Sequence, residues 1–184
     1  MKTKYPSTMI LRLCIGLGLL PIAHANAETV VEFRSMEDSS VPPDRTVCER
    51  APFYNAAYPP NVLLAASLWS LQTRANDGTI VNDTVRRIGT AMACASISSL
   101  NPGAHAPFYM EFVVGGVKLS GSGDCLVSSN NIPVRGLILA GCTLTIPADL
   151  GQGVLGGMAT SNSVFNPFSL PGYQTGSYWT VHLY

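Results

Sequence analysis

Polar and apolar residues alternate over several short stretches of this chain, which is the pattern of strands with one buried face. The stretch 108–114 shows it best, because every second side chain is large and apolar, as in Phe108, Met110 and Phe112. Strands are predicted over 29–33, 61–72, a stretch from 80, 88–97, 108–114, 117–127, 137–146, 158–165 and 178–184. The pattern therefore predicts an all-β protein.

Residues 61–72 are open to two interpretations. Leu64, Leu68 and Leu71 recur at helical spacing, whereas every second residue from Val62 onward is apolar, as in a strand. We favour the strand, since all the later stretches are β.

Turn-forming residues separate these stretches. Residues 76–79, Asn-Asp-Gly-Thr, are typical of a tight hairpin, because Gly tolerates a positive φ. Residues 101–103, Asn-Pro-Gly, force another turn. The segment 36–60 is rich in proline and serine and lacks the alternation, so we expect a loop that Cys48 pins to the body of the protein.

The C-terminal stretch 178–184 indicates how the sheet ends. Trp179, Val181 and Leu183 share one face, and an apolar face at a chain end is ordered only when it is buried. We therefore expect this strand to close a sheet. Seven to nine strands with few charges fit an antiparallel barrel of about eight strands, in which closure removes exposed strand edges; a β-sandwich is the alternative.

The first 27 residues have the composition of a secretory signal. Lys2 and Lys4 form a basic start, residues 13–22 are apolar, and Ala25-Asn26-Ala27 supplies the small residues of a cleavage site. The apolar stretch of about ten residues is much shorter than the roughly 20 of a membrane span. We expect residues 1–27 to be removed and residues 28–184 to form a single barrel-like domain without a membrane span, secreted or periplasmic.

Four cysteines remain in the mature chain, which is typical of two disulfides in an exported protein. Folding the predicted hairpin about a centre between residues 133 and 134 places Cys125 opposite Cys142. This pairing leaves Cys48 with Cys94. A zinc site is disfavoured, because no two cysteines form a Cys-x-x-Cys pair.

Charge and short motifs exclude several functions. The mature chain has eight basic and eleven acidic side chains, and its largest basic cluster is Arg86-Arg87, which argues against a nucleic-acid partner. The glycine-rich stretch 151–157 lacks the Lys-Ser or Lys-Thr of a phosphate loop, and Gly121-Ser122-Gly123 is too short for a nucleophile elbow. We expect no cofactor and no metal ion, and we assign no catalytic residue.

Two polar-aromatic groups are candidate ligand-binding residues. Tyr178 and His182 share one face of the last strand, and Tyr109 and Glu111 share one face of the strand 108–114. If these faces point inward, they line a cavity, and burial raises the pKa of the Glu111 carboxyl. If they point outward, they are the solvent side of ordinary half-buried strands, which is the alternative that we favour.

The order of the predicted strands and glycine-rich turns in residues 88–184 resembles that of the calycin-type barrels of the allene oxide cyclase and dirigent families. The shared features are a Gly-Thr-Ala strand opening at 89–91, a strand ending in Val114-Gly115-Gly116, the Gly-Ser-Gly at 121–123 and the Leu-Gly-Gly at 155–157. The resemblance implies an eight-stranded barrel, often dimeric or trimeric, that encloses a pocket for an apolar small molecule and steers it by shape without a cofactor. It identifies no individual catalytic position.

Two classes of function follow. The first is an exported barrel that binds an apolar small molecule, as a binding protein or as a cofactor-free template of the cyclase or dirigent kind. The second is a protein that acts through protein contacts: a structural or adhesive subunit, pilin-like or immunoglobulin-like, or a secreted inhibitor. The short alternation at 28–33 disfavours the pilin-like reading, since donor strands are longer.

Overall fold

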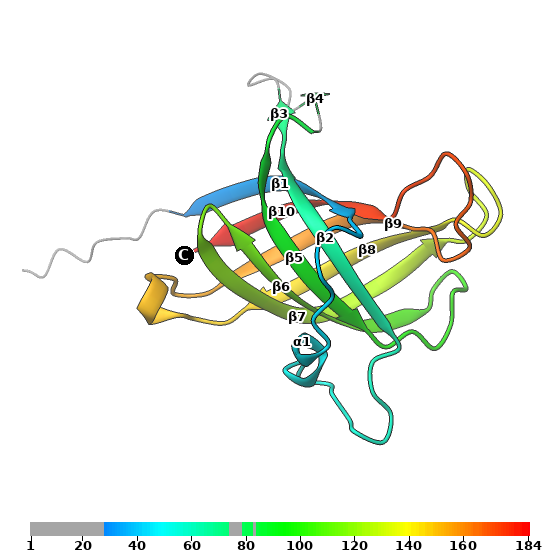
Figure 1. Cartoon of the computed structure of the whole chain (residues 1–184), viewed down its shortest axis with the longest axis horizontal. Helices are drawn as coiled ribbons and strands as arrows, with labels where there is room; N and C mark the ends of the chain where they lie inside the picture. Colours follow the sequence, from blue (N-terminus) through cyan, green and yellow to red (C-terminus); the bar gives the residue numbers. More distant parts are fainter. Residues whose placement is uncertain (1–27, 74–78, 83) are drawn as a thin grey trace, which may run out of the picture.

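Eight strands close into an antiparallel barrel in the computed structural model, which describes residues 28–73, 79–82 and 84–184 (Figure 1). The barrel strands are β1 (Thr29–Glu37), β2 (Val62–Ser70), β5 (Arg87–Ala95), β6 (His105–Val114), β7 (Val117–Ser129), β8 (Ile138–Ile146), β9 (Gly157–Phe165) and β10 (Gly176–Leu183). The smaller elements are β3 (Gln72–Thr73) paired with β4 (Ile80–Asn82), the helix α1 (Thr46–Glu49) and the 3-10 turn η1 (Leu150–Gln152). The predicted signal segment 1–27 and most of the predicted 76–79 turn lie outside the described residues.

The last strand closes the barrel, as the sequence predicted. β10 pairs with β9 on one side and with β1 on the other, in a register that runs from Thr29 opposite Leu183 to Met36 opposite Gly176. Each barrel strand therefore has a neighbour on both sides, and the barrel is confirmed over the sandwich. The strand interpretation of residues 61–72 is also confirmed, because β2 pairs with both β1 and β5.

Both predicted disulfides are present. Cys125 and Cys142 are direct partners in the β7–β8 hairpin, with their Cα atoms 4.0 Å apart. Cys48 in α1 is bonded to Cys94 in β5, across a Cα distance of 5.4 Å. Two disulfides of this kind indicate that the protein folds in an oxidising compartment.

One half of the barrel is packed, and the other half encloses a space whose lining includes six alanines. Phe33, Phe112 and Leu144 are at most 2% exposed and belong to the cluster that fills the first half. At the other end, β5 directs Ala91, Ala93 and Ala95 inward, and the larger Phe112, Met110 and Phe108 are their register partners in β6. The sequence explains this space, because the side chains of three alanines at alternate positions of one strand are too small to fill the barrel at native packing density.

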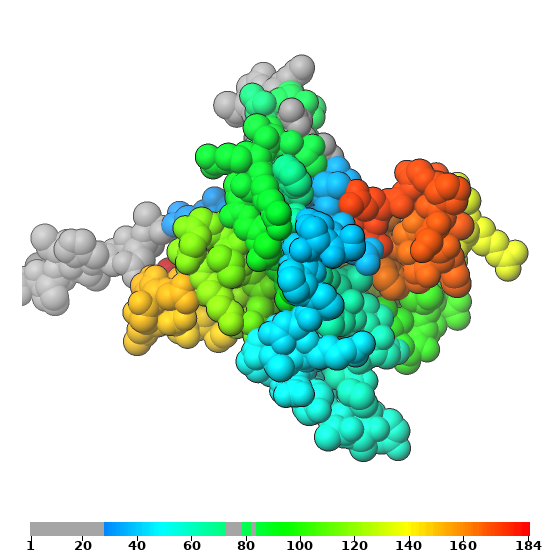
Figure 2. Space-filling view, in the orientation of Figure 1, coloured from blue at the N-terminus to red at the C-terminus, as the bar shows by residue number. Residues whose placement is uncertain are grey.

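The segment between β1 and β2 lies outside the barrel, across the wall that β2, β5 and β6 form (Figures 1 and 2). Val47, Cys48 and Ala51 pack there against Cys94 and Tyr109 in a second, smaller apolar cluster. This cluster buries outward-facing residues of β5 and β6 that would otherwise be exposed to solvent. No helix in the described part of the chain has the length and hydropathy to cross a membrane.

Candidate functional site

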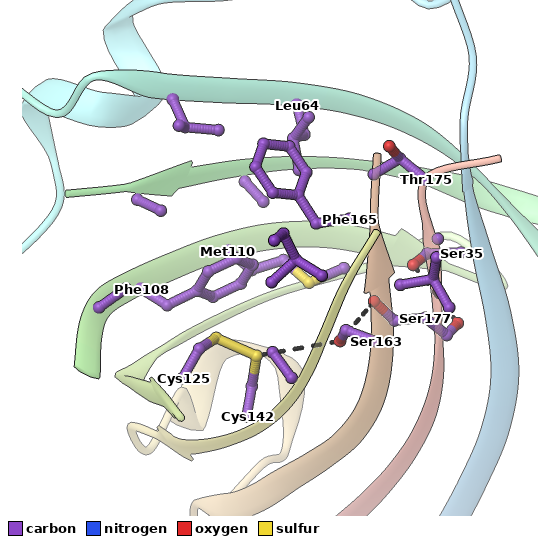
Figure 3. Close-up of a pocket in the computed structure, with 18 of the residues that line it drawn as sticks. Ser35, Leu64, Phe108, Met110, Cys125, Cys142, Ser163, Phe165, Thr175 and Ser177 are labelled. Carbon is purple, nitrogen blue, oxygen red and sulfur yellow. Dashed lines mark hydrogen bonds between the residues drawn. A yellow bond between two sulfur atoms is a disulfide. The ribbon is translucent and has the colours of Figure 1, made fainter. Parts of the chain in front are cut away.

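The hollow half of the barrel contains a cavity of about 110 Å³ (Figure 3). All eight barrel strands contribute side chains to it, and its walls are mainly alanine, valine, leucine and aromatic residues. Phe108, Met110 and Trp179 form much of the apolar wall, and the Cys125–Cys142 disulfide lies on the same surface. The cavity is at the end of the barrel where the β5–β6, β7–β8 and β9–β10 loops lie.

A row of serine side chains forms the polar part of the wall. Ser177 of β10 is the register partner of both Ser163 in β9 and Ser35 in β1, so the three hydroxyls lie side by side on the inner surface. The Ser177 hydroxyl donates a hydrogen bond of 2.8 Å to Ser163 Oγ. Trp179 Nε1 donates to Ser35 Oγ over 3.2 Å. These bonds hold the polar atoms in place within an otherwise apolar cavity.

The cavity wall carries almost no formal charge. Among the described residues that line it, Glu37 is the one ionisable side chain other than the disulfide cysteines, and it is exposed at the end of β1. The inner surface is therefore suited to an uncharged molecule, because a buried ion without a partner loses its hydration with no compensating interaction.

Tyr178 and His182 lie on the outer face of β10, opposite the buried Trp179 and Val181. His182 Nδ1 is 2.6 Å from Glu28 Oε1, and the Arg34 guanidinium lies 5.4 Å from the centre of the Tyr178 ring. Neither side chain is among those that line the cavity.

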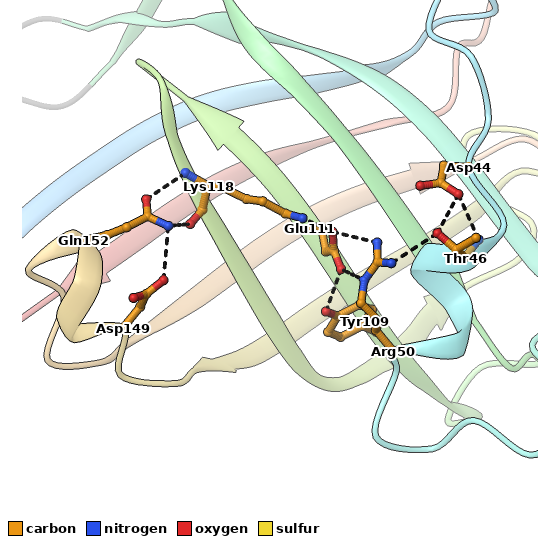
Figure 4. Close-up of polar contacts among 8 residues, drawn as sticks. All are labelled: Asp44, Thr46, Arg50, Tyr109, Glu111, Lys118, Asp149 and Gln152. Carbon is orange, nitrogen blue, oxygen red and sulfur yellow. Dashed lines mark hydrogen bonds and ion pairs between the residues drawn. The ribbon is translucent and has the colours of Figure 1, made fainter.

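Tyr109 and Glu111 also face outward, on β6, but the α1 segment covers them (Figure 4). Arg50 donates two hydrogen bonds to the Glu111 carboxylate, from Nε over 2.5 Å and from a terminal nitrogen over 3.1 Å. The Tyr109 hydroxyl donates a third, of 3.0 Å, and Lys118 Nζ lies 2.9 Å from Oε2. The carboxylate, 9% exposed, is therefore surrounded by donors.

These donors reverse the effect of burial on Glu111. Burial alone raises the pKa of a carboxyl, but the bonds from Arg50, Lys118 and Tyr109 outweigh it and lower the pKa from 4.5 to about 2. Glu111 is thus ionised at neutral pH, and it fixes α1 to the barrel wall. The raised pKa considered for an inward-facing Glu111 does not apply, because the side chain points outward.

The structure does not bring the four candidate residues together. β6 and β10 lie on opposite sides of the eight-stranded ring, so Tyr109 and Glu111 are separated from Tyr178 and His182 by the barrel itself. Of the two orientations considered from the sequence, the outward one is observed for all four residues. The cavity is instead lined by residues that were not singled out, above all Ser35, Ser163 and Ser177.

The role of Arg50 also could not be predicted from the sequence, where it is one of several scattered charges in the 36–60 loop. Its partner Glu111 is 61 residues away along the chain. The signal that could have indicated it is the proximity of Arg50 to Cys48, since a disulfide to β5 brings this segment against the neighbouring strand β6.

The chain matches no family model, no curated protein and no solved structure in comparisons with known proteins. Within the described ranges, no group of three or more His, Cys, Asp and Glu side chains is placed to hold a metal ion.

Proposed function

We propose that this protein is an exported barrel that binds an apolar small molecule in its hollow half. The observation that carries the proposal is the cavity of about 110 Å³, with apolar walls on every strand, at one end of a barrel whose other end is well packed. Binding sites for small molecules are typically concave and apolar with a few fixed polar groups, and the mouths of β-barrels are a common place for them. The two disulfides support export.

The volume of the cavity sets the size of the ligand, or of the part of a ligand that enters. An engineered apolar cavity of about 150 Å³ binds benzene, so a cavity of about 110 Å³ is suited to one small ring or a short branched chain. A larger ligand would place such a group inside and leave the rest among the loops at the open end.

The resemblance to the allene oxide cyclase and dirigent families belongs to the same proposal in its finer form. An up-and-down barrel of eight strands agrees with that resemblance at the level of the fold. In this form the cavity guides the conformation of a reactive ligand by shape, with no cofactor. Fold alone does not determine chemistry, so ligand binding is the part of the proposal to test first.

The closed barrel favours ligand binding over assembly by strand donation. Strand donation requires an open sheet edge that can accept a strand from another subunit. All eight barrel strands have a paired neighbour on both sides in the described chain, and on the β2 side of β1 only residues 29–32 lack a partner, which is a short edge for a donated strand.

Toluene is expected to bind saturably and to change the fluorescence of Trp179, which lines the cavity. The measurement uses the Trp69→Phe variant, so that Trp179 is the single tryptophan of the chain. Bound toluene should also raise the melting temperature, because it binds the folded state alone. Ala93→Phe places a ring in the cavity and should abolish both effects.

Ala148→Phe is the matched control, because Ala148 is exposed in the loop after β8, at the far end of the barrel. It should bind toluene as the parent does. Absence of saturable binding to the folded parent, or equal binding by Ala93→Phe, would refute the cavity as the site.

A further inference from the structure

The serine hydroxyls of β9 and β10 form a short chain of hydrogen bonds, in which one of the hydroxyl protons is not used by any bond among them. Ser177 Oγ donates to Ser163 Oγ, and Ser161 Oγ and Ser163 Oγ are 2.9 Å apart, with either atom as donor. Three hydroxyls supply three protons, and the two bonds among them use only two. The third proton belongs to either Ser161 or Ser163.

The burial of Ser161 determines which hydroxyl keeps the spare proton. Ser161 is 9% exposed and lies one inward position deeper than Ser163, away from the cavity surface. A buried hydroxyl proton without an acceptor costs free energy, so Ser161 donates to Ser163. Ser163 lines the cavity (Figure 3). Its own proton is then available on the cavity side.

The protein itself offers that proton only a poor acceptor. Cys142 Sγ, in the disulfide with Cys125, lies 3.9 Å from Ser163 Oγ, and a disulfide sulfur accepts hydrogen bonds weakly. Ser163 Oγ meanwhile accepts from both Ser177 and Ser161. Hydrogen bonds in a chain polarise one another, so a hydroxyl that accepts two bonds is a stronger donor than an isolated serine.

We infer that Ser163 is the hydrogen-bond donor for a carbonyl oxygen, and that the ligand is an uncharged apolar ketone, aldehyde or ester. This inference rests on the proposed function, because it needs a ligand in the cavity. A carbonyl oxygen matches the site since it accepts without donating. A carboxylate would bring a charge into an apolar wall, close to the negative Glu37 at the rim.

The test compares two molecules of the same shape, cyclohexanone and methylenecyclohexane, which differ only in the acceptor. Binding of each to the oxidised chain is measured by calorimetry, for the parent and for Ser163→Ala. The variant should bind cyclohexanone roughly tenfold more weakly relative to methylenecyclohexane than the parent does, which is the effect of one hydrogen bond. The infrared carbonyl band of bound cyclohexanone should move to higher frequency in Ser163→Ala, since the bond to the hydroxyl is lost.

Two further variants separate a specific role of Ser163 from a loss of packing. Ser163→Thr keeps a hydroxyl and should retain the preference for the ketone. Ser122→Ala removes a hydroxyl from the outer face of β7 and should change neither affinity nor the carbonyl band.

The outcomes distinguish the two proposals. If neither molecule binds the parent, the proposed function fails. If both bind and Ser163→Ala leaves their affinity ratio and the carbonyl band unchanged, the cavity is a binding site but the role of Ser163 is overturned.

Discussion

Replacing Cys48 and Cys94 together by alanine should lower the free energy of unfolding by about 4 kcal/mol. The bond joins residues 46 apart in the sequence, and a cross-link that closes a loop of this length strongly restricts the unfolded chain. The side chains of Cys48 and Cys94 are also buried, at 8% and 0% exposure, in the apolar cluster under α1. Denaturant unfolding of the oxidised variant and parent measures the difference.

The segment between β1 and β2 should also become accessible in this variant. Arg45 and Arg50 are trypsin sites in or beside α1, and they should be cut faster when the disulfide no longer holds α1 against β5. The variant Cys125→Ala/Cys142→Ala serves for comparison, because its loop of 17 residues predicts a loss of about 3 kcal/mol without faster cleavage at these two sites. A loss under about 1 kcal/mol with unchanged cleavage would show that the other contacts of α1 are sufficient to hold it.

Glu111→Gln should lower the free energy of unfolding by about 2 to 3 kcal/mol at neutral pH. The carboxylate accepts bonds from Arg50 and Tyr109 and an ion pair from Lys118, and its pKa is about 2 in the folded protein against an ordinary value of 4.5. Because the folded pKa is the lower one, this stabilisation is fully present above about pH 5 and is lost as the pH falls through 2. The difference between the variant and the parent should therefore be largest at neutral pH and diminish towards pH 2.

Glu49→Gln is the matched control, since Glu49 lies in α1 and is exposed. It should change stability by less than about 0.5 kcal/mol across the same pH range. Chemical denaturation at several pH values from 2 to 8 gives both curves. A constant difference between Glu111→Gln and the parent over this range would mean that Glu111 contributes by packing rather than by its charge.

The barrel and the Cys125–Cys142 disulfide could be predicted because they follow from local pattern and register, and the Cys48–Cys94 disulfide then followed by elimination. Alternation marked the strands, the apolar face of residues 178–184 required a partner, and counting back from the hairpin centre placed Cys125 opposite Cys142. Each of these inferences uses neighbours along the chain or across one turn. In an up-and-down barrel, most of the paired strands are also consecutive barrel strands along the chain.

The cavity could not be predicted in the same way, because alternation does not say which face is inside when both faces are polar. In β9 the residues from Thr160 to Ser163 read Thr-Ser-Asn-Ser, so neither face stands out as apolar. The inward serines became visible only when three strands were placed side by side. Arg50 and Glu111 escaped prediction for a related reason, since their contact depends on where a long irregular segment crosses the outside of the barrel.

The pairing of β1 with β10 also determines when the barrel can close during synthesis. Thr29 lies opposite Leu183, so the edge of β1 that pairs with β10 stays uncovered until β10 has been synthesised. A chain that ended before residue 176 would be an open sheet of seven strands, with β1 and β9 exposed at its edges and without Trp179 and Val181 in its core. The barrel therefore cannot close until the chain has been synthesised through β10, which ends at Leu183.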